Sequence, residues 1–265
     1  MKKTYKYNPN RHNDWNYGGK NWKLSRSKID FFLECPRCFY LDNVLGTKRP
    51  NFPPFNLNIA VDELWKREFD LFRKEQKAHH IISDNNLKAV PFQHQDLDSW
   101  RDPFVGITYL HSETNLLISG AVDDIWINDK KELLIVDYKA TAKEGEIKSL
   151  KEISWSEQYV RQLSIYRWLL EKNDFKVNPV SYLLYANADL QRDRFESKLD
   201  FKINLIAVKT DIDWIDKTLY SIKDCLESDT LPEIGERCEF CPYRQASGQK
   251  LQKIYLEQKN KLSNI

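Results

Sequence analysis

Two Cys-x-x-Cys pairs, Cys35-Pro-Arg-Cys38 and Cys238-Glu-Phe-Cys241, constrain the fold of this 265-residue chain more than any other feature. Two pairs with this spacing are typical of a metal site, because four thiolates complete a tetrahedral shell around a soft metal ion. A zinc ribbon closes its loop locally, whereas Cys38 and Cys238 are 200 residues apart. A shared metal would therefore clip the N-terminal helices to the C-terminus. The alternative is four free buried thiols, and the fifth cysteine, Cys225, is interpreted as a small core residue.

The composition is that of a folded globular protein. The 41 Lys and Arg nearly balance the 39 Asp and Glu, and 8 Trp, 13 Tyr and 13 Phe supply the apolar surface that folding requires. The longest apolar runs are far shorter than the ~20 residues that span a bilayer. No apolar segment follows the basic first residues, so we expect no secretory signal and a soluble, cytoplasmic protein without membrane contact, in which disulfides are disfavoured. The near-neutral net charge neither demands nor excludes nucleic acid.

Changes in hydrophobic period predict a mixed α/β domain with one sheet. Helices are predicted to carry Ile29 to Leu33, to run from Pro36 to Gly46, and to occupy Asn58 through Phe72, 155–170 and 212–227. Strands are predicted at 105–110, 116–127 and 132–140, as an antiparallel meander, and at 180–187 and 200–208. Residues 79–103 are expected to form a loop, and the last twenty residues a polar helix or tail.

The strongest chemical signal lies in the two strands on either side of the turn at 128–131. If these strands pair symmetrically across the turn, Asp123 faces Asp137, and the alternation of a strand places Lys139 on the same face. Opposed carboxylates with Cβ atoms about 5 Å apart repel by ~3 kcal/mol at an effective dielectric near 20. A divalent cation removes this conflict, and hard carboxylate oxygens suit Mg²⁺ or Mn²⁺.

Ordinary strand-edge charges are the alternative interpretation, and for each residue alone it is the simpler one. Together the residues favour a site, because the apolar run 133–136 buries the strand and ends at Asp137. Asp124 points to the opposite face from Asp123, so we expect it in solvent. The five His residues show no ligand spacing, and His79-His80 is expected at the surface.

Three motifs in this order resemble those of a known family. Gly120-Ala-Val-Asp123 is followed by Ile135-Val-Asp-Tyr-Lys139 and, on a predicted helix, by Gln162-Leu-Ser-Ile-Tyr166. The set is similar to the PD-(D/E)xK nuclease superfamily, specifically its RecB-like branch, which includes CRISPR-associated exonucleases carrying an iron-sulfur cluster. With the cysteines added, the resemblance covers roughly residues 25–245. It implies an α/β, restriction-endonuclease-like core, in which helices flank a mixed central sheet with an antiparallel meander and a cysteine metal site clips the two termini together.

The resemblance implies a DNA nuclease that depends on Mg²⁺ or Mn²⁺. Asp123 and Asp137 would hold the metal, and Lys139 would orient or activate the attacking water. Gln162 and Tyr166, one helical turn apart, would border the site and contact DNA or the water shell of the metal. The alternative for this pair is a solvated Gln162 and a Tyr166 that packs in the core.

One position departs from the family pattern. These nucleases commonly carry a His metal ligand on the long helix of the first half, and Asp62 stands at the matching place. An Asp is a sound ligand for Mg²⁺, and it is also an ordinary residue for a helix surface. Both interpretations of Asp62 therefore stay open.

The resemblance further implies a [4Fe-4S] cluster on Cys35, Cys38, Cys238 and Cys241. Related iron-sulfur nucleases place one cysteine near the start and three near the end, but Ser247 stands where the third would be. Cys38 would supply the missing ligand. Ligand chemistry alone also permits a structural Zn²⁺.

We expect an irregular N-terminal arm at 1–23, a PD-(D/E)xK nuclease-like domain at 24–245 and a C-terminal helix or tail at 246–265. The leading function is hydrolysis of phosphodiester bonds in DNA, exonuclease-like on ends or single strands. Expected partners are DNA and proteins of a repair, recombination or CRISPR system. The alternatives are a non-catalytic nucleic-acid binding or scaffold protein with the same fold, and a hydrolase of other phosphate esters.

Overall fold

The computed structural model describes residues 8–50, 55–154, 156–191 and 193–263. The chain forms two compact units. One combines segments from both ends of the chain, namely the residues up to Trp22, Ser27–Asn51 and the residues from Tyr220 onward. The other consists of Lys23–Arg26 and Phe52–Leu219. Residues 1–7 of the predicted N-terminal arm lie outside the described residues, and the rest of the arm includes a short 3-10 helix at Asn13–Trp15.

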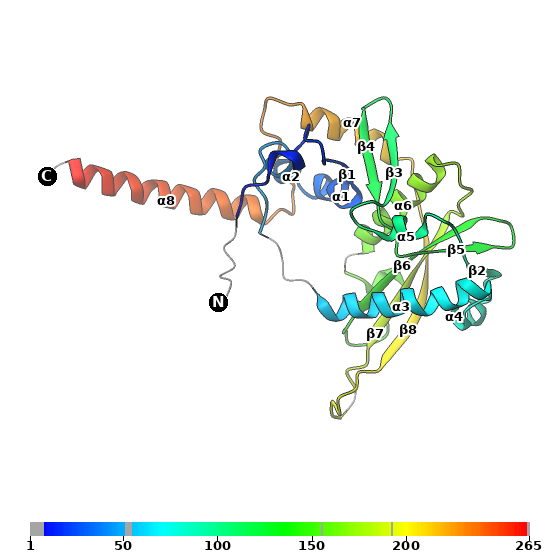
Figure 1. The fold of residues 1–265 in the computed structure, drawn as a ribbon. Coiled ribbons are helices and arrows are strands. Elements are labelled where there is room, and N and C mark those ends of the chain that lie inside the picture. Colours follow the sequence, from blue (N-terminus) through cyan, green and yellow to red (C-terminus); the bar gives the residue numbers. More distant parts are fainter. Residues whose placement is uncertain (1–7, 51–54, 155, 192, 264–265) are drawn as a thin grey trace, which may run out of the picture. The chain divides into compact units, whose positions relative to one another are not determined.

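A five-stranded sheet with the order β2-β5-β6-β7-β8 is the centre of the second unit (Figure 1). All neighbouring strands are antiparallel except β6 and β7, which are parallel. The helix α6 (Ser156–Lys172) connects these two, as a parallel pair requires a crossover. The strands are β2 (Ala89–Pro91), β5 (Asp124–Asn128), β6 (Leu133–Thr141), β7 (Val180–Ala188) and β8 (Phe201–Lys209).

The two faces of β6 carry different neighbours. The long helix α3 (Asn56–Glu75) packs Trp65 and Phe69 against the face that contains Tyr138, with ring centroids 5.2 and 5.9 Å from the Tyr138 ring. Odd-numbered residues such as Asp137 point to the other face, where α6 lies. The sheet is therefore covered on both sides at the strand that carries the predicted site.

The predicted meander is divided between two sheets. The segment 116–127 was expected to be one strand, but β4 (Leu116–Gly120) and β5 are separate. Between them the Val122 N–H donates to the Trp100 carbonyl oxygen at 3.1 Å, so the chain bonds there to a helix instead of a strand. In a second sheet, β4 pairs with β3 (Ile107–His111) and with β1 (Leu24–Ser25).

The segment 79–103 is not the loop that was predicted. It contains α4 (His80–Asp84), β2 and α5 (Leu97–Arg101), each of at most five residues. Such short elements have too few residues to establish a hydrophobic period. The expected surface position of His79 is also wrong: its ring is buried, stacks on Phe69 and bonds Glu68 Oε1 at 2.9 Å.

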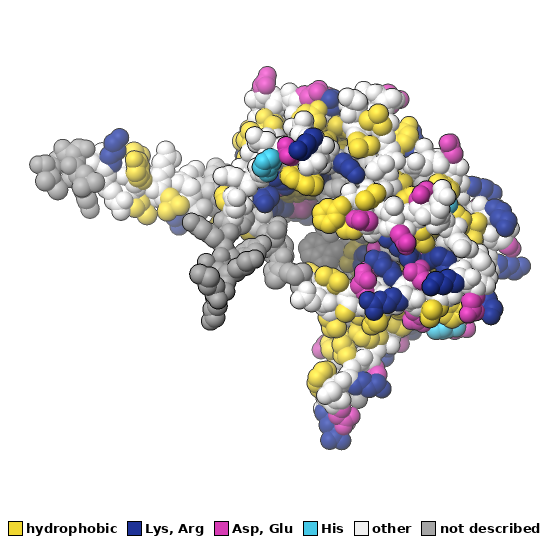
Figure 2. All heavy atoms as spheres, in the orientation of Figure 1, with side chains coloured by type: hydrophobic (Ala, Val, Ile, Leu, Met, Phe, Trp, Pro, Cys, Tyr) yellow, Lys and Arg dark blue, Asp and Glu magenta, His cyan; other side chains and the backbone are white. Residues whose placement is uncertain are grey.

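The first unit is largely helical. It contains α2 (Pro36–Asn43) and α8 (Phe240–Ser263) in full. It also contains α1 (Arg26–Glu34) apart from its first residue, and α7 (Ile215–Leu226) from Tyr220 onward. Gly235 allows the segment before α8 to approach the end of α1, because a Cβ there would lie 2.0 Å from the Glu34 carbonyl oxygen. Figure 2 shows hydrophobic side chains exposed on α8. Within the described residues, no helix has both the length and the apolar character needed to cross a bilayer.

Candidate functional site

The two acids predicted to share a face lie at the junction of β5 and β6. The strands pair in the predicted register, with Ile125 opposite Ile135. Asp123 directly precedes β5, and its Oδ2 accepts a hydrogen bond of 2.8 Å from the backbone N–H of Tyr138. Asp137, in the middle of β6, is completely buried.

Asp123 is half-buried, and its electrostatics reflect the loss of water around it and its acidic neighbour. Burial, followed by the charge of Asp137, raises the pKa of Asp123 from 3.8 to about 7, and Lys139 only partly offsets this. A divalent cation relieves the repulsion between two neighbouring carboxylates, here one half-buried and one fully buried. The oxygen donors present therefore fit a hard divalent cation.

Lys139 is held in its charged form. Its Nζ donates to Asp137 Oδ2 and lies 4.9 Å from the ring centroid of Tyr159. Burial opposes the charge, but the carboxylates of Asp137 and Asp123 outweigh it and raise the pKa of Lys139. Lys139 is therefore a cation and a hydrogen-bond donor here, and not a proton acceptor.

The helix α6 brings Gln162 and Tyr166 to the acid pair. Gln162 Nε2 donates to Asp137 Oδ1 at 2.8 Å and to the Tyr166 hydroxyl at 2.9 Å. Both side chains are buried, so the solvated Gln162 of the alternative interpretation is excluded. Burial raises the pKa of Tyr166, so the phenol keeps its proton. The two side chains thus fix the orientation of the Asp137 carboxylate.

Gly120, the first residue of the motif that ends in Asp123, is needed for this close packing of α6. A Cβ at Gly120 would lie 2.8 Å from Leu169 Cδ1 and 3.0 Å from the ring of Tyr166. A larger residue would displace the Leu169 side chain and the ring of Tyr166, whose hydroxyl accepts a hydrogen bond from Gln162.

Asp62 lies at the border of the site and is engaged by a lysine. Lys66, one helical turn further along α3, places Nζ 2.7 Å from Asp62 Oδ2. Burial and the charge of Asp123 raise the pKa of Asp62, which shows that the two acids lie within electrostatic reach. Among the described residues, the carboxylates of Asp62, Asp123 and Asp137 do not form a group whose ligand oxygens all lie within 4.8 Å.

Asp124 is not in solvent as predicted, but is completely buried. Its carboxylate accepts from Arg73 Nη2, from Arg101 Nη2 at 2.8 Å and from the Tyr138 hydroxyl at 2.9 Å. The opposite-face assignment was correct, but that face is covered by α3 and α5. Figure 2 shows basic and acidic side chains gathered together in the region of α3. Asp124 is therefore a structural anchor next to the candidate metal ligand Asp123.

Arg101, which sequence reasoning missed, connects this anchor to the site. Its Nε donates to the backbone oxygen of Asp123 at 3.0 Å, and its Nη1 contacts both carboxylate oxygens of Asp70 at 2.9 and 3.1 Å. The burial of Arg73 could have been predicted from the sequence, because Arg73 follows Trp65 and Phe69 at the same spacing of four residues. An arginine on the buried face of α3 indicates a buried acidic side chain that pairs with it.

We expect Arg101→Met to weaken binding of Mn²⁺ to the acid pair by about tenfold, because residues that orient metal ligands contribute on that scale. It should also lower the free energy of unfolding by about 3 kcal/mol, since it removes a partner of buried Asp124. Calorimetric titration with Mn²⁺ and urea denaturation measure the two effects. The control is Arg67→Met, which removes an exposed arginine of α3. A folded Arg101→Met protein with unchanged Mn²⁺ affinity would contradict this role.

The four predicted cysteines converge within the unit that combines both ends of the chain. Their ligand atoms all lie within 4.8 Å of one another, all four side chains are buried and none forms a disulfide. The Cys38 and Cys241 sulfurs are 3.3 Å apart, although 203 residues separate them. Ser247, at the place of the third C-terminal cysteine, donates instead to the Arg244 carbonyl oxygen at 3.3 Å.

Backbone N–H groups donate hydrogen bonds to these sulfurs. Cys35 Sγ accepts from the N–H groups of Cys38 and Gly235 at 3.5 and 3.3 Å. Burial opposes ionisation of Cys238, but the Cys241 backbone N–H and the neighbouring thiols outweigh it and lower the pKa of Cys238 to about 7. Burial raises the pKa of Cys38 and of Cys241, so it is the closeness of the four sulfurs that makes the group suited to a metal that binds thiolates.

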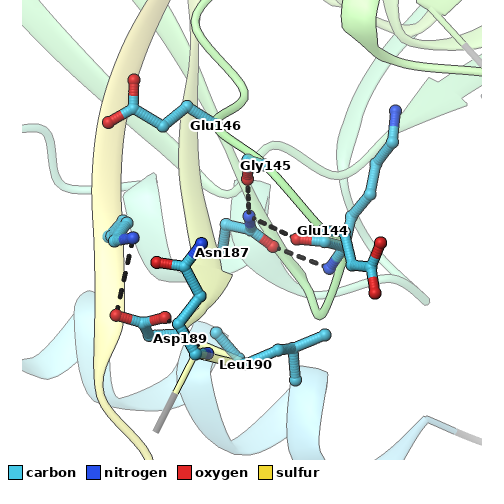
Figure 3. Close-up of a pocket in the computed structure, with 10 residues that line it drawn as sticks. Glu144, Gly145, Glu146, Asn187, Asp189 and Leu190 are labelled. Atoms are coloured by element: carbon cyan, nitrogen blue, oxygen red, sulfur yellow. Dashed lines mark hydrogen bonds and ion pairs between the residues drawn. The ribbon is translucent and has the colours of Figure 1, made fainter.

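A pocket of about 510 Å³ lies at the ends of β6 and β7 where the loops that follow them begin (Figure 3). The Asn187 side chain holds the loop beside it through hydrogen bonds of 2.9 Å to the backbone of Lys143 and Gly145. Its lining mixes acidic residues such as Glu144 and Asp189 with lysines, and includes none of the predicted site residues. The pocket is therefore distinct from the acid pair.

Fold and site together define a nuclease-like α/β protein: a mixed sheet that presents two acids and a lysine, with a helix carrying Gln and Tyr against them. Comparison with protein families gives the same result, because the model of the PD-(D/E)XK nuclease superfamily matches residues 56–246. The chain belongs to this superfamily.

Other comparisons are more distant. No curated protein matches the sequence. A solved structure described as the crystal structure of SSO0001 is similar with a TM-score of 0.35 and 12% sequence identity, over 79% of this chain and 78% of that chain.

Proposed function

We propose that the protein is a deoxyribonuclease that uses Mg²⁺ or Mn²⁺ and acts, like an exonuclease, on DNA ends or single strands. Membership of the nuclease superfamily supports hydrolysis of nucleic acid. The observation that carries the proposal is the acid pair of half-buried Asp123 and fully buried Asp137, with the Lys139 ammonium bonded to Asp137. A scaffold protein has no need of this arrangement, because neighbouring like charges with little water around them destabilise the fold.

In the proposed mechanism Asp123 and Asp137 would hold the metal ion. When bound, the ion supplies Lewis acidity and an ionised water at neutral pH. The Lys139 ammonium donates hydrogen bonds to the attacking water or to a phosphate oxygen, where negative charge develops in the transition state. Gln162 and Tyr166 would keep the Asp137 carboxylate oriented for the metal, and Asp62 would be a further ligand.

The finer assignments follow from the same proposal. We place the nuclease-like domain at 24–245, after an N-terminal arm at 1–23 and before a C-terminal helix or tail at 246–265. We also assign the chain to the RecB-like branch, because its nuclease motifs occur together with cysteines near both ends. Those cysteines bind a structural metal ion or a [4Fe-4S] cluster. DNA repair, recombination or CRISPR adaptation in the cytoplasm would supply the DNA and the partner proteins.

Incubation of the purified protein with end-labelled single- and double-stranded DNA and either Mg²⁺ or Mn²⁺ tests the proposal. Release of short labelled products that stops on addition of EDTA is the expected result. Closed circular DNA is the control, because an exonuclease leaves it intact. Binding of DNA without cleavage under all metal conditions would refute the nuclease and support the non-catalytic alternative.

The raised pKa of Asp123 predicts a pH dependence of metal binding. Because the pKa is about 7, binding below pH 7 must displace a proton, so Mg²⁺ affinity should rise about tenfold per pH unit and level off above pH 7. In the metal-free protein the folded state binds this proton between about pH 4 and 7 while the unfolded chain does not. The contribution of Asp123 to the stability of the folded protein therefore falls as the pH rises through that range.

Calorimetric Mg²⁺ titrations and melting curves of the metal-free protein from pH 5 to 8 measure these effects. In Asp123→Asn the fall in stability with rising pH should disappear. A wild-type Mg²⁺ affinity that is constant between pH 5.5 and 7 would contradict the assignment.

A further inference from the structure

We propose that the four cysteines bind a single tetrahedral Zn²⁺, in place of the four-iron cluster that the resemblance to iron-sulfur nucleases implies. The inference concerns the cysteine site in the unit that combines both ends of the chain. It does not depend on nuclease activity of the acid pair.

The spacing of the sulfur atoms decides between the two centres. Four sulfurs at about 2.3 Å from one Zn²⁺ form a tetrahedron with edges of about 3.8 Å. The observed separations are 3.3 Å between Cys38 and Cys241, 3.7 Å between Cys38 and Cys238, and 3.8 Å between Cys35 and Cys241. A four-iron cluster places a separate iron at each cysteine and holds the sulfurs much further apart. The observed group matches one ion at its centre.

The local backbone of both pairs also suits a single ion. Cys35 is the N-cap of α2, which begins with Pro36, and its sulfur accepts a hydrogen bond from the backbone N–H of Cys38. The sulfur of Cys238 accepts one from the backbone N–H of Cys241 in the same way. Each pair thus forms a tight knuckle in which the second residue stabilises the thiolate of the first. Two such knuckles facing each other supply four sulfurs in the two-plus-two arrangement of structural zinc sites.

Two arginines compensate the charge of the centre. Arg49 Nη2 lies 3.5 Å from Cys238 Sγ, and Arg244 Nη2 lies 3.5 Å from the sulfurs of both Cys38 and Cys241. Zn²⁺ with four thiolates carries a charge of about −2, and two guanidinium groups bring it close to zero, which lowers the cost of burial. An oxidised cluster would carry the same charge, so the arginines support a metal–thiolate centre and the spacing identifies it as zinc.

Arg49 is itself fixed in place. Its guanidinium carbon lies 4.5 Å from the ring centroid of Phe31 and 4.3 Å from that of Phe240, and Glu34 pairs with it at 2.7 Å. A side chain stacked between two rings loses little entropy on hydrogen bonding. We therefore assign Arg49 and Arg244 as positioning residues of the zinc site.

Metal analysis of the protein purified without oxygen tests the inference, because a cluster would survive such a preparation. The expected result is one zinc per chain, no acid-labile sulfide and no visible absorption, and Co²⁺ exchanged into the site should give the visible spectrum of a tetrahedral four-thiolate complex. Four irons with sulfide would overturn the zinc assignment while leaving the cysteine metal site in place, and so would one iron without sulfide. A protein without any metal would overturn both.

Release of zinc to a chelator tests the arginines. Arg49→Met and Arg244→Met should each release zinc about tenfold faster than wild type, a loss on the scale expected for residues that hydrogen-bond metal ligands. The matched control is Arg37→Met, because Arg37 Nε donates to the Pro232 carbonyl oxygen in the same region but contacts none of the sulfurs. Wild-type release rates in both variants would refute the positioning role without affecting the zinc assignment.

Discussion

Replacement of Asp137 by Asn should lower the rate of DNA cleavage at least about 10³-fold while the protein stays folded. The change removes the charge of a proposed metal ligand, and metal-assisted stabilisation of a phosphoryl transition state is worth several kcal/mol. The amide oxygen can still accept the hydrogen bond from Gln162 that Asp137 Oδ1 receives at 2.8 Å. Relief of the repulsion with Asp123 and loss of the charge partner of Lys139 act in opposite directions, and Asp123 still compensates Lys139, so the melting temperature should stay close to that of wild type.

Single-turnover cleavage of labelled DNA and a thermal melt measure both properties on the same preparation. Asp129→Asn is the matched control, since it makes the same chemical change at an exposed position of the same hairpin. Cleavage by Asp137→Asn at the wild-type rate would remove Asp137 from the active site. Loss of cleavage together with unfolding would show instead that the acid is structural.

Cys238→Ser should lower the melting temperature by roughly 10 °C and release the metal from the cysteine site. Binding of a structural metal contributes directly to folding, and a loss of several kcal/mol shifts the midpoint by that amount in a chain of this size. The effect should be strongest at the two ends of the chain, and hydrogen exchange in α2 and α8 would detect it. Cleavage per folded molecule should change much less, since the acids lie in the other unit.

The control for this experiment is Cys225→Ser, which makes the same substitution at a buried cysteine outside the group. It should keep the metal and most of the stability. If Cys238→Ser retained both the wild-type melting temperature and the bound metal, the four cysteines would not share one centre.

The acid pair could be predicted because it depends on local rules. A short hairpin turn sets the register of β5 and β6, and the two-residue period of a strand then determines which side chains share a face. This is sufficient to place Asp123 beside Asp137 and to add Lys139. The contacts of Gln162 with Asp137 required only the additional fact that α6 crosses over that face.

The remaining parts of the site depend on contacts that no local pattern encodes. Asp124 was assigned to the correct face, but its burial results from arginines 51 and 23 residues away in sequence. One of them belongs to α5, a helix of five residues that shows no period. In the same way, the convergence of the cysteines follows from their spacing, whereas Arg49 and Arg244 approach the sulfurs only in the folded unit.

The separation of the cysteine pairs along the chain also determines when this part of the protein can form. Ribosomes add about 5–20 residues per second, so the second pair emerges about 10–40 s after the first, from which it is separated by 200 residues. The domain between them can fold during that interval, while the first two thiols remain without their partners. Capture of the proposed metal would therefore be a late step of biosynthesis, and slow translation or oxidising stress would act most strongly on these two early thiols.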